Sequence, residues 1–172
     1  MSLIFRGRAW KFGDDVDTGQ IIPGQYLTLT DPAELARHAM EAIRPGFAGQ
    51  IQPGDLIVAG KNFGTGSSRE HAARALKFAG IAGVIADSLA RIFFRNAFNI
   101  GLAAVPVKGI SAMVVEGDLL EVDLEQGTVL NLNSGARLDF KPLPPIMLAI
   151  LAEGGIIPYT ARVLTPGGGA RP

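Results

Sequence analysis

The chain has 172 residues, 48% of them hydrophobic, which fits one globular domain with a sizeable core. Its 16 basic and 16 acidic residues give a net charge of zero, which argues against nucleic acid or an anionic membrane as the main partner. The sequence has no cysteine, so it forms no disulfide, offers no thiol nucleophile and cannot hold an iron–sulfur cluster by itself.

The sequence also carries no signal for a metal site, a membrane span or secretion. Two histidines, His38 and His71, are too few for a His-rich zinc site, so we expect this chain to bind no metal. No apolar run reaches the ~18 residues that a transmembrane helix needs. Arg6, Arg8 and Lys11 interrupt the N-terminus, which therefore does not resemble a signal peptide. We expect a cytoplasmic protein.

In chain order, the first predicted element is a helix over residues 32–43, with Asp31 as its N-cap and Pro32 at its first position. Short apolar runs bounded by Gly, Pro or Asp then predict three buried strands. Helical patterns lie between them. The predicted strands are residues 56–60, 83–87 and 102–107, and the helices are residues 68–79 and 88–99. This order predicts an α/β fold with a mostly parallel core sheet joined by crossover helices.

The last third of the chain has a different pattern. Apolar residues alternate with acidic or amide residues over residues 119–140, and Gly-containing turns separate the runs, so a small antiparallel meander is predicted. A last helix is expected over residues 144–152, ended by a Gly-Gly pair. Residues 165–172 are rich in Gly and Pro and are expected to be disordered, which leaves residues 1–164 as one domain.

The most informative stretch is Lys-Asn-Phe-Gly-Thr-Gly-Ser-Ser-Arg-Glu-His at residues 61–71, which follows a predicted strand and opens an Ala-rich helix. Gly64 and Gly66 allow close backbone approach and left-handed dihedral angles. Ser67 and Glu70 have the spacing of a capping box, so Ser67 is the predicted N-cap. The free amides of the first turn would then form an anion site at the positive end of the helix dipole.

Arg69 sharpens this prediction, because a cation in the first helical turn opposes the helix dipole at a cost of about 0.3–1 kcal/mol. The arrangement is favourable if an anion sits between Arg69 and the free amides, since a guanidinium binds a carboxylate through two parallel hydrogen bonds. Two alternatives remain open. In the first, Arg69 faces solvent or pairs with Glu70. In the second, the loop binds phosphate, although no Lys-Ser or Lys-Thr pair ends it.

Residues 66–71, Gly-Ser-Ser-Arg-Glu-His, resemble the signature of the swivelling domain of aconitases and of their isopropylmalate and homoaconitate relatives. Further segments match in order and extend the resemblance over nearly the whole chain. They are residues 13–18, 21–23, 54–55, 86–93, 95–96 and 154–159. Three positions depart from the usual pattern, with Thr65 in place of Cys, Gly19 in place of Asp and Ala73 in place of Pro.

The resemblance implies a three-layer β/β/α swivelling domain that acts as the small subunit of a heterodimer or heterotetramer. The large subunit would carry a [4Fe-4S] cluster, and this chain would bind no cofactor. Ser67 matches the position of the catalytic base, and Ser68 and Arg69 match positions that hold substrate carboxylate. A serine is a poor base unless amide donors and positive charge stabilise its alkoxide, and Gly66 and the helix start can supply such donors.

Supporting roles are assigned to two residues that follow Arg69 and to two residues of the N-terminal motif at residues 13–18. Glu70 and His71 follow Arg69 directly, and Asp17 and Thr18 belong to the N-terminal motif. We expect His71 to be structural or to support the site indirectly, because a single helical histidine is usually structural. Direct catalysis by His71 is the alternative.

The loop that sets substrate choice in this family corresponds to Tyr26, Leu27, Thr28 and Leu29. Homoaconitases tend to have an arginine there, which meets an extra substrate carboxylate, whereas this loop is neutral and suits an apolar group. The resemblance thus implies a hydro-lyase, and isopropylmalate in leucine biosynthesis is the leading substrate. Citramalate, dimethylmalate and homoaconitate hydratases remain alternatives, as does a non-catalytic module that binds a dicarboxylate. A further alternative is that the loop residues serve only for packing.

Overall fold

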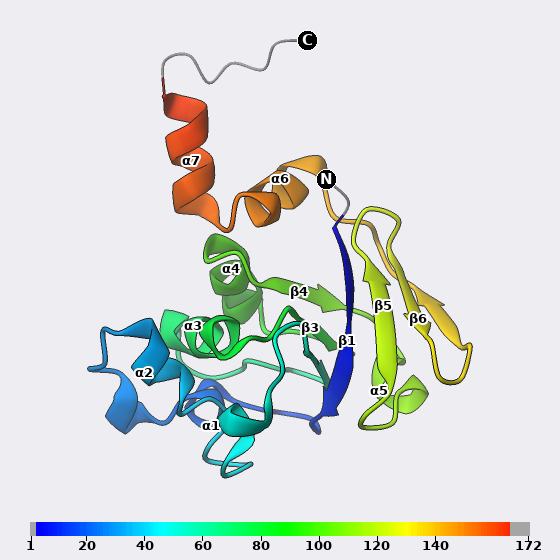
Figure 1. Cartoon of the computed structure of the whole chain (residues 1–172), viewed down its shortest axis with the longest axis horizontal. Coiled ribbons are helices and arrows are strands. Elements are labelled where there is room, and N and C mark those ends of the chain that lie inside the picture. Colours follow the sequence, from blue (N-terminus) through cyan, green and yellow to red (C-terminus); the bar gives the residue numbers. More distant parts are fainter. Residues whose placement is uncertain (1–2, 166–172) are drawn as a thin grey trace.

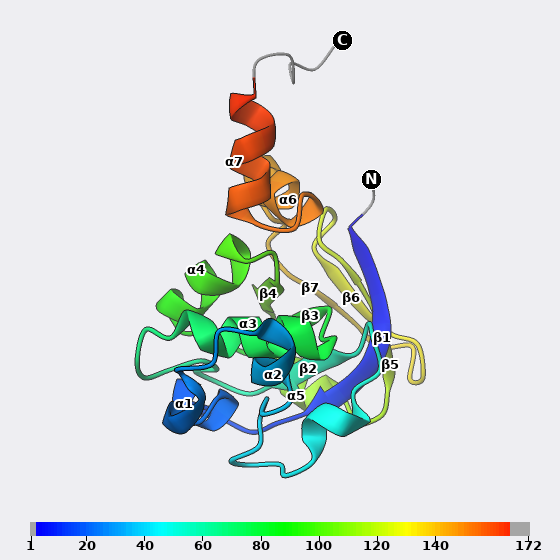
Figure 2. The same cartoon turned by 60° about the vertical axis from the view of Figure 1, so that its left-hand side comes forward.

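The computed structural model describes residues 3–165 (Figures 1 and 2). Within this range, one mixed sheet has the strand order β4-β3-β2-β1-β5-β6-β7. The strands are β1 (Ile4–Lys11), β2 (Leu56–Ala59), β3 (Gly83–Ala86), β4 (Ala103–Pro106), β5 (Leu119–Asp123), β6 (Thr128–Asn131) and β7 (Arg137–Asp139). The expected α/β class is confirmed.

The first four strands form a parallel half, because β1 pairs with β2, β2 with β3 and β3 with β4 in parallel. Its crossover helices are α3 (Glu70–Ala79) and α4 (Arg91–Asn99). The three predicted strands of this half are confirmed, and all residues of β2 and β3 are buried. They are continuously apolar because layers cover both faces of the sheet.

Strand β1 was not predicted, although it joins the two halves of the sheet. It runs parallel to β2 on one side and antiparallel to β5 on the other. Arg6 and Arg8 interrupt the apolar pattern by which a strand is predicted. Both form ion pairs with distant acids: Arg6 Nε lies 2.5 Å from Glu121 Oε2 and Arg8 Nη2 lies 3.1 Å from Asp55 Oδ2.

Strands β5, β6 and β7 form the antiparallel half, and the predicted meander is confirmed. Its residues alternate between buried and more exposed positions, as one covered face requires. Figure 1 shows β5 and β6 rising beside β1, so that the sheet curls around one end of the core.

Two hydrophobic clusters lie on the two faces of the parallel half. Ile57 and Val84 belong to the cluster that α3 and α4 cover, whereas Val58 and Ile85 belong to the cluster shared with β5 and β6. Successive residues of a strand point to opposite faces, so a short apolar strand serves both clusters. The arrangement gives the expected β/β/α layers.

Helix boundaries differ from the predictions where the loops are constrained. The helix expected over residues 32–43 ends early, as α2 (Pro32–Ala36), and the chain turns at Met40, where φ is +58°. Helices α3 and α4 begin two or three residues later than predicted. Short elements fill the connections: α1 (Thr18–Ile21), η1 (Gly24–Tyr26), η2 (Phe47–Gln50) and α5 (Ile110–Met113).

Two helices close the described chain. The predicted helix is confirmed as α6 (Pro145–Ala152), but a further helix, α7 (Ile156–Leu164), was not predicted and projects from the body (Figures 1 and 2). Gly155 joins them, and a Cβ there would lie 2.7 Å from the Asn99 carbonyl oxygen. The tail predicted to be disordered lies, from residue 166 on, outside the described residues.

No single helix among residues 3–165 is long and apolar enough to cross a membrane. Helices α6 and α7 reach the required length and composition only as a pair, and they are bent by 97° relative to each other.

Candidate active site

The Gly-rich loop at residues 60–66 follows β2, and the N-terminal motif at residues 13–18 follows β1. Because β1 and β2 are parallel neighbours, both segments leave the sheet at the same edge. Hydrogen bonds join them: the Gly64 amide donates to the Val16 carbonyl (2.7 Å) and the Thr18 amide donates to the Thr65 carbonyl (2.8 Å). Two motifs nearly fifty residues apart in sequence thus form one structure.

A third segment, which follows β3, holds the loop from its other flank. The Asn62 amide donates to Ser88 Oγ (2.8 Å), and the Ala90 amide donates to the Phe63 carbonyl (2.9 Å). Helix α4 packs closely against the loop at Gly64, whose φ is +83°. A Cβ at Gly64 would lie 2.3 Å from Phe93 Cβ. Only glycine fits such a position.

The predicted cap at Ser67 is wrong. Helix α3 begins at Glu70, and its N-cap is Arg69, which has extended dihedral angles and no side-chain cap bond. The chain turns sharply just before the helix, where the Arg69 amide donates to the Ser67 carbonyl (2.8 Å). Tethering of residues 63–65 to their neighbours therefore delays the start of the helix by two residues.

This correction leaves Ser67 free for other contacts. Ser67 and Ser68 are exposed, and neither hydroxyl is hydrogen-bonded within residues 3–165. In the same range the backbone amides of Gly66, Ser67 and Ser68 have no acceptor. Gly66 has a φ of +100° and is exposed like the two serines that follow it. Hydroxyls and free amides together suit an anionic ligand.

The Arg69 guanidinium lies over the segment that contains α1 and η1. Its Nη1 is 3.5 Å from the Ile22 carbonyl oxygen, and a Cβ built on Gly24 would lie 3.8 Å from both Nη atoms. No acid pairs with Arg69 in the described chain, so the alternative pairing with Glu70 is not found. A Cβ on Gly19 would lie 3.7 Å from Nη1, so the Asp usual there would have been a neighbour of this cation.

The predicted supporting residues divide into two groups. Asp17 caps α1 by accepting from the Gln20 amide (2.8 Å), and Thr18 is buried beside Gly66, whose Cβ would lie 3.4 Å from Thr18 Oγ1. These two residues shape the floor of the loop. Glu70 is exposed and His71 is partly buried, and neither side chain is bonded to another described residue.

The predicted specificity loop lies next to Arg69 through Gly24, which begins η1. Tyr26 stacks on His38 with ring centroids 3.6 Å apart, and its hydroxyl donates to Glu41 (3.3 Å). Leu27 and Leu29 are partly buried and pack against the core, so Thr28 is the exposed member of the loop. The clamp of His38 and Glu41 on Tyr26 was not predicted, because it depends on the turn at Met40.

Sequence reasoning gave no role to Arg91 and Arg95 of α4. With residues 64–66, Ala90 and Ile92, they line a hollow of about 490 Å³ beside the loop. A detectable signal did exist, since the two arginines stand one helical turn apart and no acid occurs between Asp87 and Glu116.

Known proteins resemble this chain over most of its length. The model of the aconitase C-terminal domain matches residues 47–109. The 3-isopropylmalate dehydratase small subunit 1 of Methanopyrus kandleri is 55% identical and covers 92% of this chain and 94% of its own length. The isopropylmalate/citramalate isomerase small subunit of Methanocaldococcus jannaschii is 54% identical over 94% of this chain and 96% of its own length.

The chain belongs to the family of 3-isopropylmalate dehydratase small subunits. A crystal structure of 3-isopropylmalate dehydratase from M. jannaschii has a TM-score of 0.88 at 45% identity, covering 94% of this chain and 95% of that one. The resemblance to the aconitase swivelling domain is thereby confirmed, and membership of a family of small subunits implies a large-subunit partner.

Proposed function

We propose that the chain is the small subunit of a hydro-lyase that interconverts 2-isopropylmalate and 3-isopropylmalate by dehydration and rehydration, a reaction of leucine biosynthesis. The observation that supports this most directly is the loop of Ser67, Ser68 and Arg69, with free hydroxyls, free amides and a guanidinium that has no acidic partner among residues 3–165. The names of the relatives supply the substrate.

The chemistry requires removal of a proton from the carbon next to a carboxylate. Ser67 is the proposed base, and it acts as an alkoxide held by the amides around Gly66 and by nearby positive charge. Arg69 and Ser68 are the proposed carboxylate ligands. They fix the substrate so that the proton faces Ser67 Oγ, since correct placement contributes much of a barrier reduction.

The other half of the reaction, loss of hydroxide, is assigned to the partner. This chain has no cysteine, and residues 3–165 contain no group of three or more acidic or histidine side chains that could hold a metal. It therefore does not fit a [4Fe-4S] cluster, which we assign to the large subunit. Treatment of the isolated chain with iron and sulfide should leave it colourless; a cluster spectrum would contradict this division.

The substrate arm that distinguishes malate derivatives is proposed to lie against the specificity loop. Leu27 and Leu29 pack inward, so the arm meets mainly Thr28, the exposed residue of the loop. An extra carboxylate there would lose water without gaining a cation, whereas an isopropyl group gains roughly 25 cal/mol per Å² of buried apolar area. Citramalate remains a second candidate, because one methylene changes binding by only about 1–3 kcal/mol.

The test is turnover by the chain assembled with its cluster-bearing large subunit. We expect the highest kcat/KM for isopropylmalate, a lower value for citramalate and the lowest for homoaconitate. Thr28→Arg should shift the ratio of isopropylmalate to homoaconitate towards the tricarboxylate by about tenfold, as one ion pair allows. Assembly without turnover on any of these would instead favour a dicarboxylate-binding module.

A further inference from the structure

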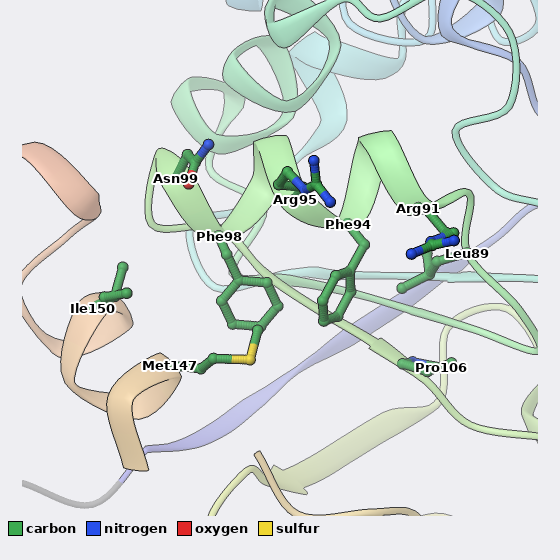
Figure 3. A pocket seen from close by; sticks show the side chains of 9 residues that line it. All are labelled: Leu89, Arg91, Phe94, Arg95, Phe98, Asn99, Pro106, Met147 and Ile150. Atoms are coloured by element: carbon green, nitrogen blue, oxygen red, sulfur yellow. The ribbon is translucent and has the colours of Figure 1, made fainter. Parts of the chain in front are cut away.

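Two hollows on the surface share the side chains of Arg91 and Arg95. The first, of about 490 Å³, reaches the loop at residues 64–66. The second, of about 560 Å³, lies between α4, β4 and α6 and is mostly apolar (Figure 3). We call the two together the docking groove. Its apolar part is lined by Leu89, Phe94, Phe98, Pro106, Met147 and Ile150.

The charge in the docking groove is unbalanced. Neither arginine forms an ion pair or a hydrogen bond with any residue between 3 and 165. Arg91 is the first residue of α4, where a cation opposes the helix dipole, and Arg95 lies one turn further, where like charges repel. The nearest acid in sequence, Asp87, is already bonded to the Gly109 amide and to Ser111 Oγ. The arrangement becomes favourable when an anionic group meets it.

The rest of the docking groove is lined mainly by apolar side chains and suits an apolar occupant. Figure 3 shows Phe94 and Phe98 side by side on α4, with Met147 and Ile150 on the facing turns of α6. Ile92, in the first hollow, is 48% exposed although it is a large apolar residue. An occupant with an apolar side chain next to carboxylates therefore complements this surface better than a small dicarboxylate, which needs few apolar neighbours.

We propose that the docking groove receives an apolar segment of the large subunit that is flanked by acidic residues. This inference rests on the proposed function, in which Ser67, Ser68 and Arg69 hold the substrate and the large subunit carries the cluster. The surface that adjoins the loop is then covered on assembly. Contact at Arg91 and Arg95 also steadies the loop, because Phe93 of the same helix packs against Gly64.

The experiment measures the dissociation constant between the full chain and the purified cluster-bearing large subunit at several salt concentrations. Replacing Arg91→Glu together with Arg95→Glu should weaken association at least tenfold and flatten its salt dependence, and Arg95→Glu alone should weaken it severalfold. Arg137→Glu is the matched control, an exposed arginine on β7 at the opposite end of the sheet, and it should leave association unchanged. Circular dichroism should match for all variants.

Two results would overturn the inference. Unchanged association with a raised KM in the double variant would mean that these arginines bind substrate. Equal weakening by Arg137→Glu would mean that net charge, not the docking groove, controls assembly. A wild-type pair that associates but turns over no substrate would contradict the proposed function only, since the dissociation constants would still decide where the large subunit binds.

Discussion

The parallel and the antiparallel halves of the sheet are of similar size but differ in whether their connections carry predicted site residues. All predicted site residues lie on connections of the parallel half, after β1 and β2, and the hollow beside them is completed after β3. The antiparallel half contains none of them. Parallel strands end at a common edge, so their loops meet there, whereas the tight turns of a meander occupy both edges and leave no comparable junction. Site formation therefore follows from strand direction.

The largest expected effect is on catalysis, and it is confined to the parallel half. Ser67→Ala should lower kcat of the assembled enzyme by about 10²–10⁴-fold, as loss of a general base does. Its stability should change by less than about 0.5 kcal/mol, because Ser67 is exposed and is not the helix cap. Steady-state kinetics and urea unfolding measure the two quantities.

Ser134→Ala in the meander is the matched control, an exposed serine whose Oγ accepts a hydrogen bond from the Ala136 amide (3.2 Å). It should leave kcat unchanged. Near-normal turnover of Ser67→Ala would assign the base to another residue and would break the comparison.

Two glycines, one in each half of the sheet, test how tightly the connections of the two halves are packed. Gly64 and Gly135 have similar φ values, +83° and +78°, but a Cβ at Gly64 would lie 2.3 Å from Phe93, and at Gly135 it would meet nothing within 4 Å. Gly64→Ala should cost about 2–4 kcal/mol of unfolding free energy, from overpacking added to backbone strain. Gly135→Ala should cost only the strain, about 1 kcal/mol. Equal shifts of the urea midpoint would show that α4 does not press on the loop.

The next expected effect is on substrate binding, and it again separates the parallel half, through Arg69, from the meander. Arg69→Lys retains the charge but cannot make two parallel hydrogen bonds, so kcat/KM should fall about 10–100-fold, through KM, at the cost of one charge-assisted bond. Arg137→Lys in the meander should have no effect on either constant. A fall in kcat alone would mean that Arg69 acts in the transition state and not in substrate binding.

The smallest expected effect concerns an ion pair that joins the helical layer to the loop before β5. Arg44 Nη1 and Nη2 donate to Glu116 at 2.8 and 2.5 Å, and the Lys11 amide donates to the same carboxylate (3.1 Å). The hydrogen bond from Arg44 is the main cause that lowers the pKa of Glu116 below its ordinary value. The folded state thus favours the ionised carboxylate.

A lowered pKa means that this contribution is present above the ordinary glutamate pKa and is lost as the pH falls through the folded pKa. Because Glu116 is partly exposed, the contribution is at most about 1 kcal/mol. Between pH 7 and pH 3 the wild type should therefore lose up to about 1 kcal/mol more unfolding free energy than Glu116→Gln, as measured by urea unfolding. Glu125→Gln, at an exposed turn of the meander, should leave the dependence of the unfolding free energy on pH in this range unchanged.

Much of the fold and of the candidate site was predictable from local patterns. Buried strands such as β2 and β3 are short apolar runs, and the meander alternates, because each pattern reflects how many faces are covered. The positions of Ser67 and Arg69 followed from a motif whose glycines are needed for close backbone contact. These features depend on residues near one another in the chain.

The remaining features depend on contacts that no local pattern contains. Strand β1 was missed because the partners of Arg6 and Arg8 lie 115 and 47 residues away. The cap at Ser67 was wrong because bonds from the loop to residues 16–18 fix its backbone before the helix begins. The place of Arg91 and Arg95 beside the loop was set by the pairing of β3 with β2. The sequence by itself determined the elements and the chemistry of the loop, and tertiary contacts decided which free groups face each other, since those contacts form only when distant segments meet.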